Sequence, residues 1–339
     1  MMRHMIPARE VPREMFFTPH DAKYGWVVLD TTNGRGYGKA QLVTRYVNED
    51  AQLPDVLKKL RSETAAEILK SGETGVIRPW NGKRYYLKSF SITRTRDDER
   101  PRIHFEFGPS DYLNFLATSL NLDRELYVND EKFTLRDKYL AGKDPYGKPV
   151  AFLAHSFGIN LAVLTRDNYV LLVQRSVNVK SRPGLWNIAV NEGLQRPTDG
   201  DVNGNPNFYR AAIRGVYEEL GVSITESDSD WPLFLSFGLD WELYQYALGR
   251  VRLNLTAKEI LEIREVACKD KWESRELHPV IFSLKSLASF VREHYPWSPA
   301  GLVCLIHTLM MEEGLTIEKV MKEFAKAGIR HEVFRGSST

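Results

Sequence analysis

The chain has 339 residues, of which 43% are hydrophobic and 27% charged, and its formal net charge is +2. This length favours two or so domains, and the composition is ordinary for a globular protein with a sizeable core. A net charge this small creates no overall field that would favour nucleic acid or an anionic membrane as partner. The two cysteines, Cys268 and Cys304, cannot make a disulfide framework, so we expect a reducing, cytoplasmic location.

The first residues carry charges and prolines without the apolar segment of a signal peptide. The most apolar stretch, residues 302–311, is too short to span a bilayer. We therefore expect no membrane association.

The N-terminal part mixes a helix with strands. Residues 1–22 are expected to be a loosely ordered leader. In chain order, the patterns then predict a strand at 26–29, a turn at 33–36, a helix at 54–69, a β-rich stretch at 84–95, a turn at 97–101, a strand at 103–107 and a helix opened by 109–111 that runs to 120.

Basic and aromatic residues interleave between Lys83 and Arg102. Such a stretch can bind nucleic acid, because phosphate neutralisation and base stacking combine there. The simpler interpretation is an exposed hairpin whose other face is core, since three acidic residues at 97–99 dilute the charge. We favour the hairpin and do not expect nucleic acid as a partner.

The second half alternates strands with helices. It predicts a hairpin at 159–164 and 169–174, an extended run at 186–190, a turn-rich loop at 191–205, a helix at 206–220, strands at 233–239 and 243–248, a helix at 256–265, a strand at 279–282, and helices at 283–294, 299–313 and 316–327. This order indicates a mixed sheet with helices against it, an α/β or α+β domain. Pro and Gly in the polar stretch 122–150 suggest a boundary, which divides the chain into a leader (1–22), an N-terminal α+β domain of unknown role (23–145), a second domain (150–315) and a C-terminal helix and tail (316–339).

The helix at 206–220 has clear ends and two carboxylates close to its C-terminus. Asn205 suits the N-cap, Pro206 the first helical position and Gly221 a left-handed C-cap. Glu218 and Glu219 oppose the helix dipole there, each by about 0.3–1 kcal/mol. Mg²⁺ would offset this cost because it prefers carboxylate oxygens, whereas the plain alternative is a solvated pair partly neutralised by Arg214.

This helix resembles the second half of the Nudix box, G-x5-E-x7-R-E-U-x-E-E-x-G-U, in which U is aliphatic. The matching residues are Arg214, Val216, Glu218, Glu219, Gly221 and Val222. If Gly193 is the glycine of the box, the sixth residue after it is Asp199, where the family has Glu. The interval from Asp199 to Arg214 is then about twice that of the family, so the loop carries an insertion. The resemblance covers roughly residues 150–315.

The resemblance implies a Nudix-like α/β/α sandwich with a mixed sheet, preceded by the separate, smaller α+β domain. It also implies hydrolysis of a nucleoside diphosphate linked to another group, with Mg²⁺ or Mn²⁺ neutralising the pyrophosphate and activating a water. By position, Glu218 and Glu219 would bind the metal and act in catalysis, and Arg214 would orient a neighbouring carboxylate.

One position departs from the family, because Gly215 stands where the box has the Glu after the Arg. Glycine supplies no ligand and weakens a helix interior by about 1 kcal/mol relative to Ala. An acid from elsewhere could complete the metal site. Glu192, directly before Gly193, is the preferred substitute, and the other candidates are Asp199, Asp201, Glu265 and Glu273.

Two functions stay open at this point. The first is a metal-dependent Nudix-like hydrolase with Glu218, Glu219 and Glu192 as metal ligands. The second is a Nudix fold that has lost its chemistry at Gly215 and senses a nucleotide-type small molecule or a protein partner. Self-association as a homodimer is left open.

Overall fold

The computed structural model describes residues 13–18, 21–32, 35–73, 81–94, 101–128, 131–179, 181–225, 231–268 and 274–334. Within these residues the largest sheet is mixed and has ten strands. Its order is β10 (Trp186–Ile188), β9 (Tyr169–Arg175), β8 (Phe157–Leu164), β13 (Gln245–Arg252), β12 (Leu233–Asp240), β2 (Asp21–Thr31), β1 (Arg13–Thr18) and β15 (Arg330–Phe334), with β11 (Val190–Gly193) paired to β8 and β14 (Ser274–Ile281) to β9.

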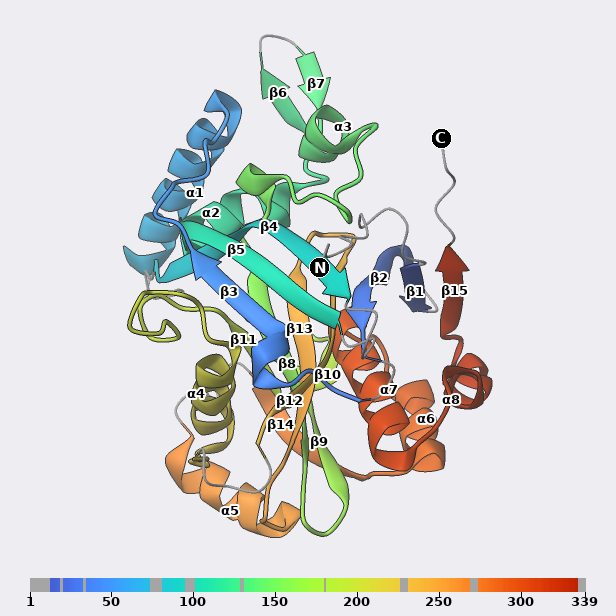
Figure 1. Ribbon diagram of the computed structural model, residues 1–339. Coiled ribbons are helices and arrows are strands. Elements are labelled where there is room, and N and C mark those ends of the chain that lie inside the picture. Colours follow the sequence, from blue (N-terminus) through green and yellow to red (C-terminus); the bar gives the residue numbers. More distant parts are fainter. Residues whose placement is uncertain are drawn as a thin grey trace, which may run out of the picture.

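Helices cover both faces of this sheet (Figure 1). One face packs against α4 (Phe208–Leu220), which contacts α5 (Ala257–Ala267); the other carries α6 (Leu284–Glu293), α7 (Pro299–Glu313) and α8 (Ile317–Phe324). Alternation along β8 explains the two cores, since successive side chains of a strand point to opposite faces. Ile159 and Leu161 enter the core on the α4 side, whereas Ala162 and Leu164 enter the core on the α7 side. The mixed α/β architecture expected from the sequence is thus confirmed.

A second, three-stranded sheet lies on the α4 side. It contains β3 (Leu42–Tyr46), β5 (Pro101–Asp111) and β4 (Lys83–Arg94), with β5 in the middle, and it is accompanied by α1 (Asp55–Glu73) and α2 (Tyr112–Ala117). A small hairpin, β6 (Leu126–Val128) and β7 (Glu131–Phe133), and the short helix α3 (Leu135–Leu140) follow.

Aromatic side chains join the two sheets. Phe105 of β5 lies edge-on to Phe157 of β8 and Phe237 of β12, with ring centroids 5.7 and 5.0 Å apart. Phe107 lies 4.9 Å from Phe157 and 6.3 Å from Phe208 of α4. The small sheet therefore covers the face of the large sheet that lies beside α4 (Figure 1).

Pairings also cross the boundary expected near residues 145–150. Strand β2, from the range assigned to an N-terminal domain, pairs antiparallel with β12 of the second half. Residues 13–18, expected in the leader, form β1 and pair with both β2 and β15. Strand β15 lies after the last predicted helix, in the range expected as the C-terminal tail. The separate N-terminal domain stays a prediction, but these contacts place its residues in the same sheet as the second half.

The start of α4 differs from the expectation. Its N-cap is Asn207, not Asn205, because the Asn207 side chain accepts hydrogen bonds from the backbone N–H groups of Tyr209 and Arg210. The Asn205 side chain instead accepts from the N–H of Tyr46 at 2.8 Å. The C-terminal prediction is confirmed, since Gly221 is left-handed with φ of 73°.

Parts of two predicted turns, residues 33–34 and 97–100, lie outside the described residues. None of the described helices is both long enough and apolar enough to cross a membrane.

Phe105→Ala should destabilise the protein strongly, because it opens a cavity between the two sheets. We expect a loss of about 3–5 kcal/mol in the free energy of unfolding, measured by denaturant titration. Val43→Ala is the control, since Val43 sits in the same small sheet but is 36% exposed. Equal losses in the two variants would mean that the small sheet does not depend on this contact.

Candidate functional site

Helix α4 carries the motif, and its orientation follows from an apolar stripe. Phe208, Ala212, Val216 and Leu220 recur every four residues and are all buried. This stripe faces the large sheet, so the intervening Arg214 lies along the side of the helix, next to the loop that precedes it.

The guanidinium of Arg214 donates hydrogen bonds to three carboxylates. Its Nε and Nη2 donate to the two carboxylate oxygens of Asp199 at 3.0 and 2.9 Å. Its Nη1 donates to Glu192 at 2.6 Å and to Glu218 at 2.7 Å, and Nη2 also donates to the carbonyl of Gly193 at 3.0 Å. A guanidinium has five N–H donors, so all the donors of Arg214 are used within the chain.

The cluster is shielded from water. The side chain of Arg214 is 9% exposed, that of Glu192 12%, and that of Asp199 is fully buried. Burial alone would lower the pKa of Arg214, but the carboxylates of Glu192 and Asp199 outweigh it and raise that pKa above its ordinary value. The arginine is therefore a permanent cation at the point where the acids meet.

Gly215 allows strand β11 to approach the helix closely. A Cβ built on Gly215 would lie 2.6 Å from Cγ of Glu192 and 2.7 Å from Cγ1 of Val190. The side chain of Glu192 thus occupies the space that a larger residue at 215 would need. We expected Glu192 to substitute for the missing acid, and its side chain lies directly against Gly215.

Glu219 lies outside the group that Arg214 gathers. It is 8% exposed, and its backbone carbonyl accepts from Nε of Arg264 and Sγ of Cys268, both at 3.1 Å. Glu218 and Glu219 are adjacent on the helix, so their side chains point to different sectors. Glu218 faces Arg214, while Glu219 belongs to the buried side of α4.

Two of the carboxylates share one partner on Arg214. Oε2 of Glu192 and Oε2 of Glu218 both accept from Nη1 of Arg214, at 2.6 and 2.7 Å. Among the residues that the structure describes, no group of three or more His, Cys, Asp or Glu side chains is arranged to hold a metal ion.

The remaining candidate acids are used elsewhere or lie apart. Asp201 binds the N–H groups of Asn203 and Asn205 at 2.8 and 2.9 Å, which folds the inserted loop. Glu265 is exposed on α5, and Glu273 lies outside the described residues.

Arg84 lies beside Gly193, which no pattern in the sequence indicated. Its guanidinium lies over Gly193, since a Cβ built on that glycine would overlap Nη1 of Arg84. An isolated bridge between Arg84 and Gln195 brings the start of β4 to this loop. Arg84 belongs to the basic stretch singled out above, but nothing local to that stretch indicates that it reaches a glycine more than a hundred residues away.

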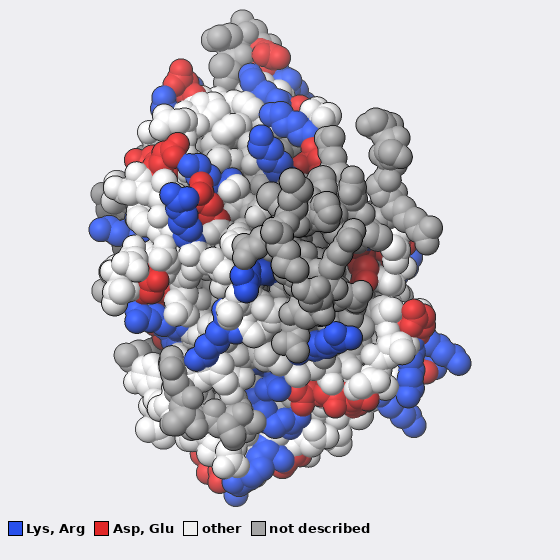
Figure 2. Space-filling model, viewed as in Figure 1, with Lys and Arg blue, Asp and Glu red and all other residues white. Residues whose placement is uncertain are grey.

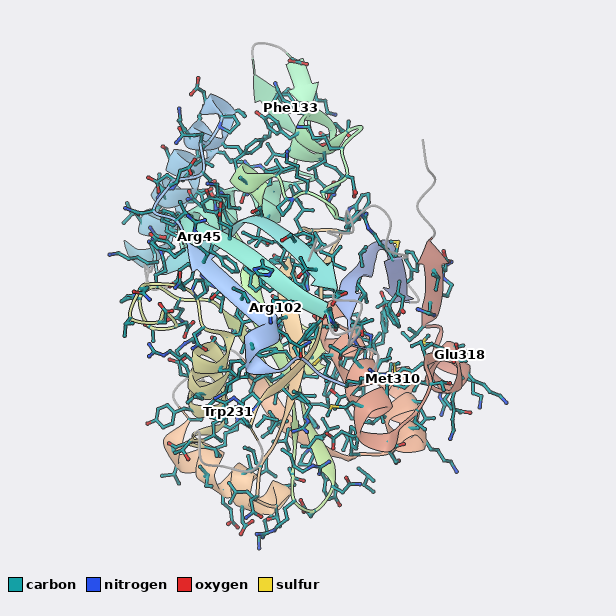
Figure 3. All side chains as sticks on the ribbon, in the orientation of Figure 1. Arg45, Arg102, Phe133, Trp231, Met310 and Glu318 are labelled. Atoms are coloured by element: carbon teal, nitrogen blue, oxygen red, sulfur yellow. The ribbon has the colours of Figure 1, made fainter. Side chains whose placement is uncertain are left out.

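The outer face of the small sheet carries mixed charges. Arg45 of β3 and Arg102 of β5 lie on neighbouring strands there (Figure 3). Glu106 contacts both Arg45, at 3.8 Å, and Lys88, at 3.3 Å. Lys and Arg are likewise interspersed with Asp and Glu over this face of the molecule (Figure 2). Among the described residues, the expected basic stretch is thus partly neutralised.

Comparison with known proteins gives fold-level likenesses only. No protein-family model and no curated protein matches the chain. Three similar solved structures are DR0079 from Deinococcus radiodurans (13% identity, 45% of this chain and 82% of that one, TM-score 0.32), the MutT protein from Methanosarcina mazei (14%, 50% and 94%, TM-score 0.29) and the Nudix domain of NrtR from Shewanella oneidensis, complexed with ADP-ribose (16%, 50% and 94%, TM-score 0.28). At TM-scores this low, the likenesses carry no argument about what this chain does.

Arg214→Gln should be strongly destabilising because it leaves buried carboxylates without their cation. We expect a loss of about 3–5 kcal/mol in the free energy of unfolding. Arg210→Gln is the matched control one turn earlier on α4, since Arg210 is exposed and should cost no more than about 1 kcal/mol. The free energy of unfolding of both variants is measured by urea denaturation. Similar small losses in the two variants would mean that the cluster tolerates an uncompensated acid.

Gly215→Ala should also destabilise, against the ordinary trend. Ala favours a helix interior over Gly by about 1 kcal/mol, but its Cβ would press on Glu192 and Val190. We expect a net loss of about 1–3 kcal/mol in the free energy of unfolding, typical of overpacking. A gain in stability on denaturation would contradict the close approach of β11 to α4.

Proposed function

We propose that this chain is a Nudix-like ligand-binding module that takes a nucleotide-type small molecule and does not hydrolyse it by metal-dependent chemistry. The observation that carries the proposal is the guanidinium of Arg214, which uses all its donors on Glu192, Asp199, Glu218 and the Gly193 carbonyl.

The resembled reaction needs carboxylates that are available to a cation and a water. In this chain Glu192 and Glu218 are bound to Arg214, and Gly215 stands where a further acid would be. Moving the bound oxygen of either residue from Arg214 to a cation would leave the guanidinium short of partners in a mostly buried place, which costs several kcal/mol. The acids therefore support a structural role for the box better than a catalytic one.

A hollow on the outer side of α4 supports the ligand part of the proposal. It is an open, shallow hollow bordered by Arg210, Ile213, Tyr217 and Ile224. Tyr217, 38% exposed, offers a ring face for a base, and Arg210 offers a cation for a phosphate. Ile213 and Ile224 add apolar surface to its lining. These groups match the mixed aromatic and anionic character of a nucleotide.

The test combines binding and turnover. Nucleoside phosphates, dinucleotides and nucleotide sugars are screened by thermal shift, and release of nucleoside monophosphate is followed with Mg²⁺ or Mn²⁺. We expect at least one compound to raise the melting temperature without metal-dependent turnover, because a ligand at 100 times its Kd stabilises by about 2.7 kcal/mol. Tyr217→Ala should abolish the shift, whereas Tyr127→Ala, 66% exposed on the small hairpin, should keep it.

Two results would contradict the proposal. Metal-dependent turnover that is lost in Glu219→Gln would make the chain a hydrolase with a rebuilt site. If no nucleotide raises the melting temperature, nucleotides are not the ligands of this chain.

A further inference from the structure

The large sheet ends in two strands that each pair on one side only. Among the described strands, β14 pairs only with β9, and β15 pairs only with β1. The outer edge of such a strand presents backbone N–H and C=O groups that can pair with another chain, unless proline or charge blocks it. Strand β14 contains Pro279, which has no N–H to donate. Strand β15 contains no proline, so its outer edge is the one that can pair with a further strand.

The charged side chains of β15 are exposed. The strand lies at the rim of the molecule (Figure 1), and the side chains of Arg330 and Glu332 are 62% and 45% exposed. Side chains alternate along a strand, so Arg330 and Glu332 stand on one face of the sheet and His331 and Val333 on the other. The guanidinium of Arg330 is 3.7 Å from the carboxylate of Glu332, and an exposed ion pair of this kind is weak. Both charges are therefore available to a partner.

Strand β15 is held in place from its inner side. Nε2 of His331 lies 3.3 Å from Oε2 of Glu14 on β1, and the His331 ring lies 4.7 Å from the ring of Phe16. The guanidinium carbon of Arg330 lies 5.1 Å from the centre of the Phe17 ring. A strand that is already ordered loses little conformational entropy when it pairs on its other side, which favours association.

The charges of β15 are self-complementary in an antiparallel pairing. If two copies of the strand pair about a twofold axis at His331, Arg330 of each copy stands opposite Glu332 of the other copy. Opposite charges directly across two strands stabilise their pairing, whereas like charges destabilise it. An axis at Glu332 would place the two Glu332 side chains opposite each other. The charges therefore favour the register centred on His331 over this neighbouring register.

We propose that β15 is a self-association surface, through which two copies of this chain join their large sheets into one continuous sheet. The interface is isologous, because the same strand serves on both copies. Backbone hydrogen bonds between the two edges supply the attraction, and the two Arg330–Glu332 pairs set the register. The proposal is independent of the proposed function, since the hollow beside α4 is lined by residues between 198 and 224.

The experiment exchanges charges between two variants and follows their mass by analytical ultracentrifugation at increasing concentration. The unsubstituted chain should form dimers. Arg330→Glu places four acids across the two strands and Glu332→Lys places four bases there, so each variant alone should dimerise about tenfold more weakly or worse. An equimolar mixture of the two should form heterodimers, because the acids of one variant then face the bases of the other. The double variant Arg330→Glu/Glu332→Arg should dimerise like the unsubstituted chain.

Lys258→Glu is the matched control. It changes the net charge by the same amount as Arg330→Glu, but it lies on the exposed surface of α5, so dimerisation should be unchanged. The proposal is overturned if the unsubstituted chain stays monomeric up to about 1 mM, which corresponds to a binding free energy of only about 4 kcal/mol. It is also overturned if Arg330→Glu dimerises as well as Lys258→Glu, or if the equimolar mixture forms no heterodimer. If a single variant does not fold, the double variant decides, and a monomeric double variant contradicts the register.

Discussion

The ion pairs of Arg214 are the constraint on which this region depends. One guanidinium ties together the end of β11, the inserted loop and helix α4 through Glu192, Asp199 and Glu218. A buried cation with several carboxylates is stable only while the whole set is present, because each member left alone would be an uncompensated charge. The loop, although expanded, is therefore held in one place relative to the helix by charge as well as by packing.

Gly215 is unfavourable for the helix alone but favourable for the packing of β11 against α4. A glycine weakens the interior of α4, yet it lets β11 come close enough for Glu192 to reach Arg214. Glu192 therefore reaches Arg214 from the strand, whereas Glu218 reaches it from one turn further along the same helix.

Local signals were enough to predict most elements but few of the contacts between them. Helix α7 has the predicted limits, because these depend on residues a few positions apart. The spacing of the motif also indicated Asp199, which does meet Arg214. No local sequence pattern predicts the contact of Arg84 with Gly193, because long-range pairing is set by the tertiary fold.

The same physics explains why the boundary near residue 150 looked convincing. Polar, Pro- and Gly-containing segments separate two stretches that each show their own periodicity, and only β-sheet pairing and aromatic packing join them afterwards. Both kinds of contact join residues that are far apart in the chain. No pattern within residues 122–150 could therefore indicate them, because long-range pairing is set by the tertiary fold.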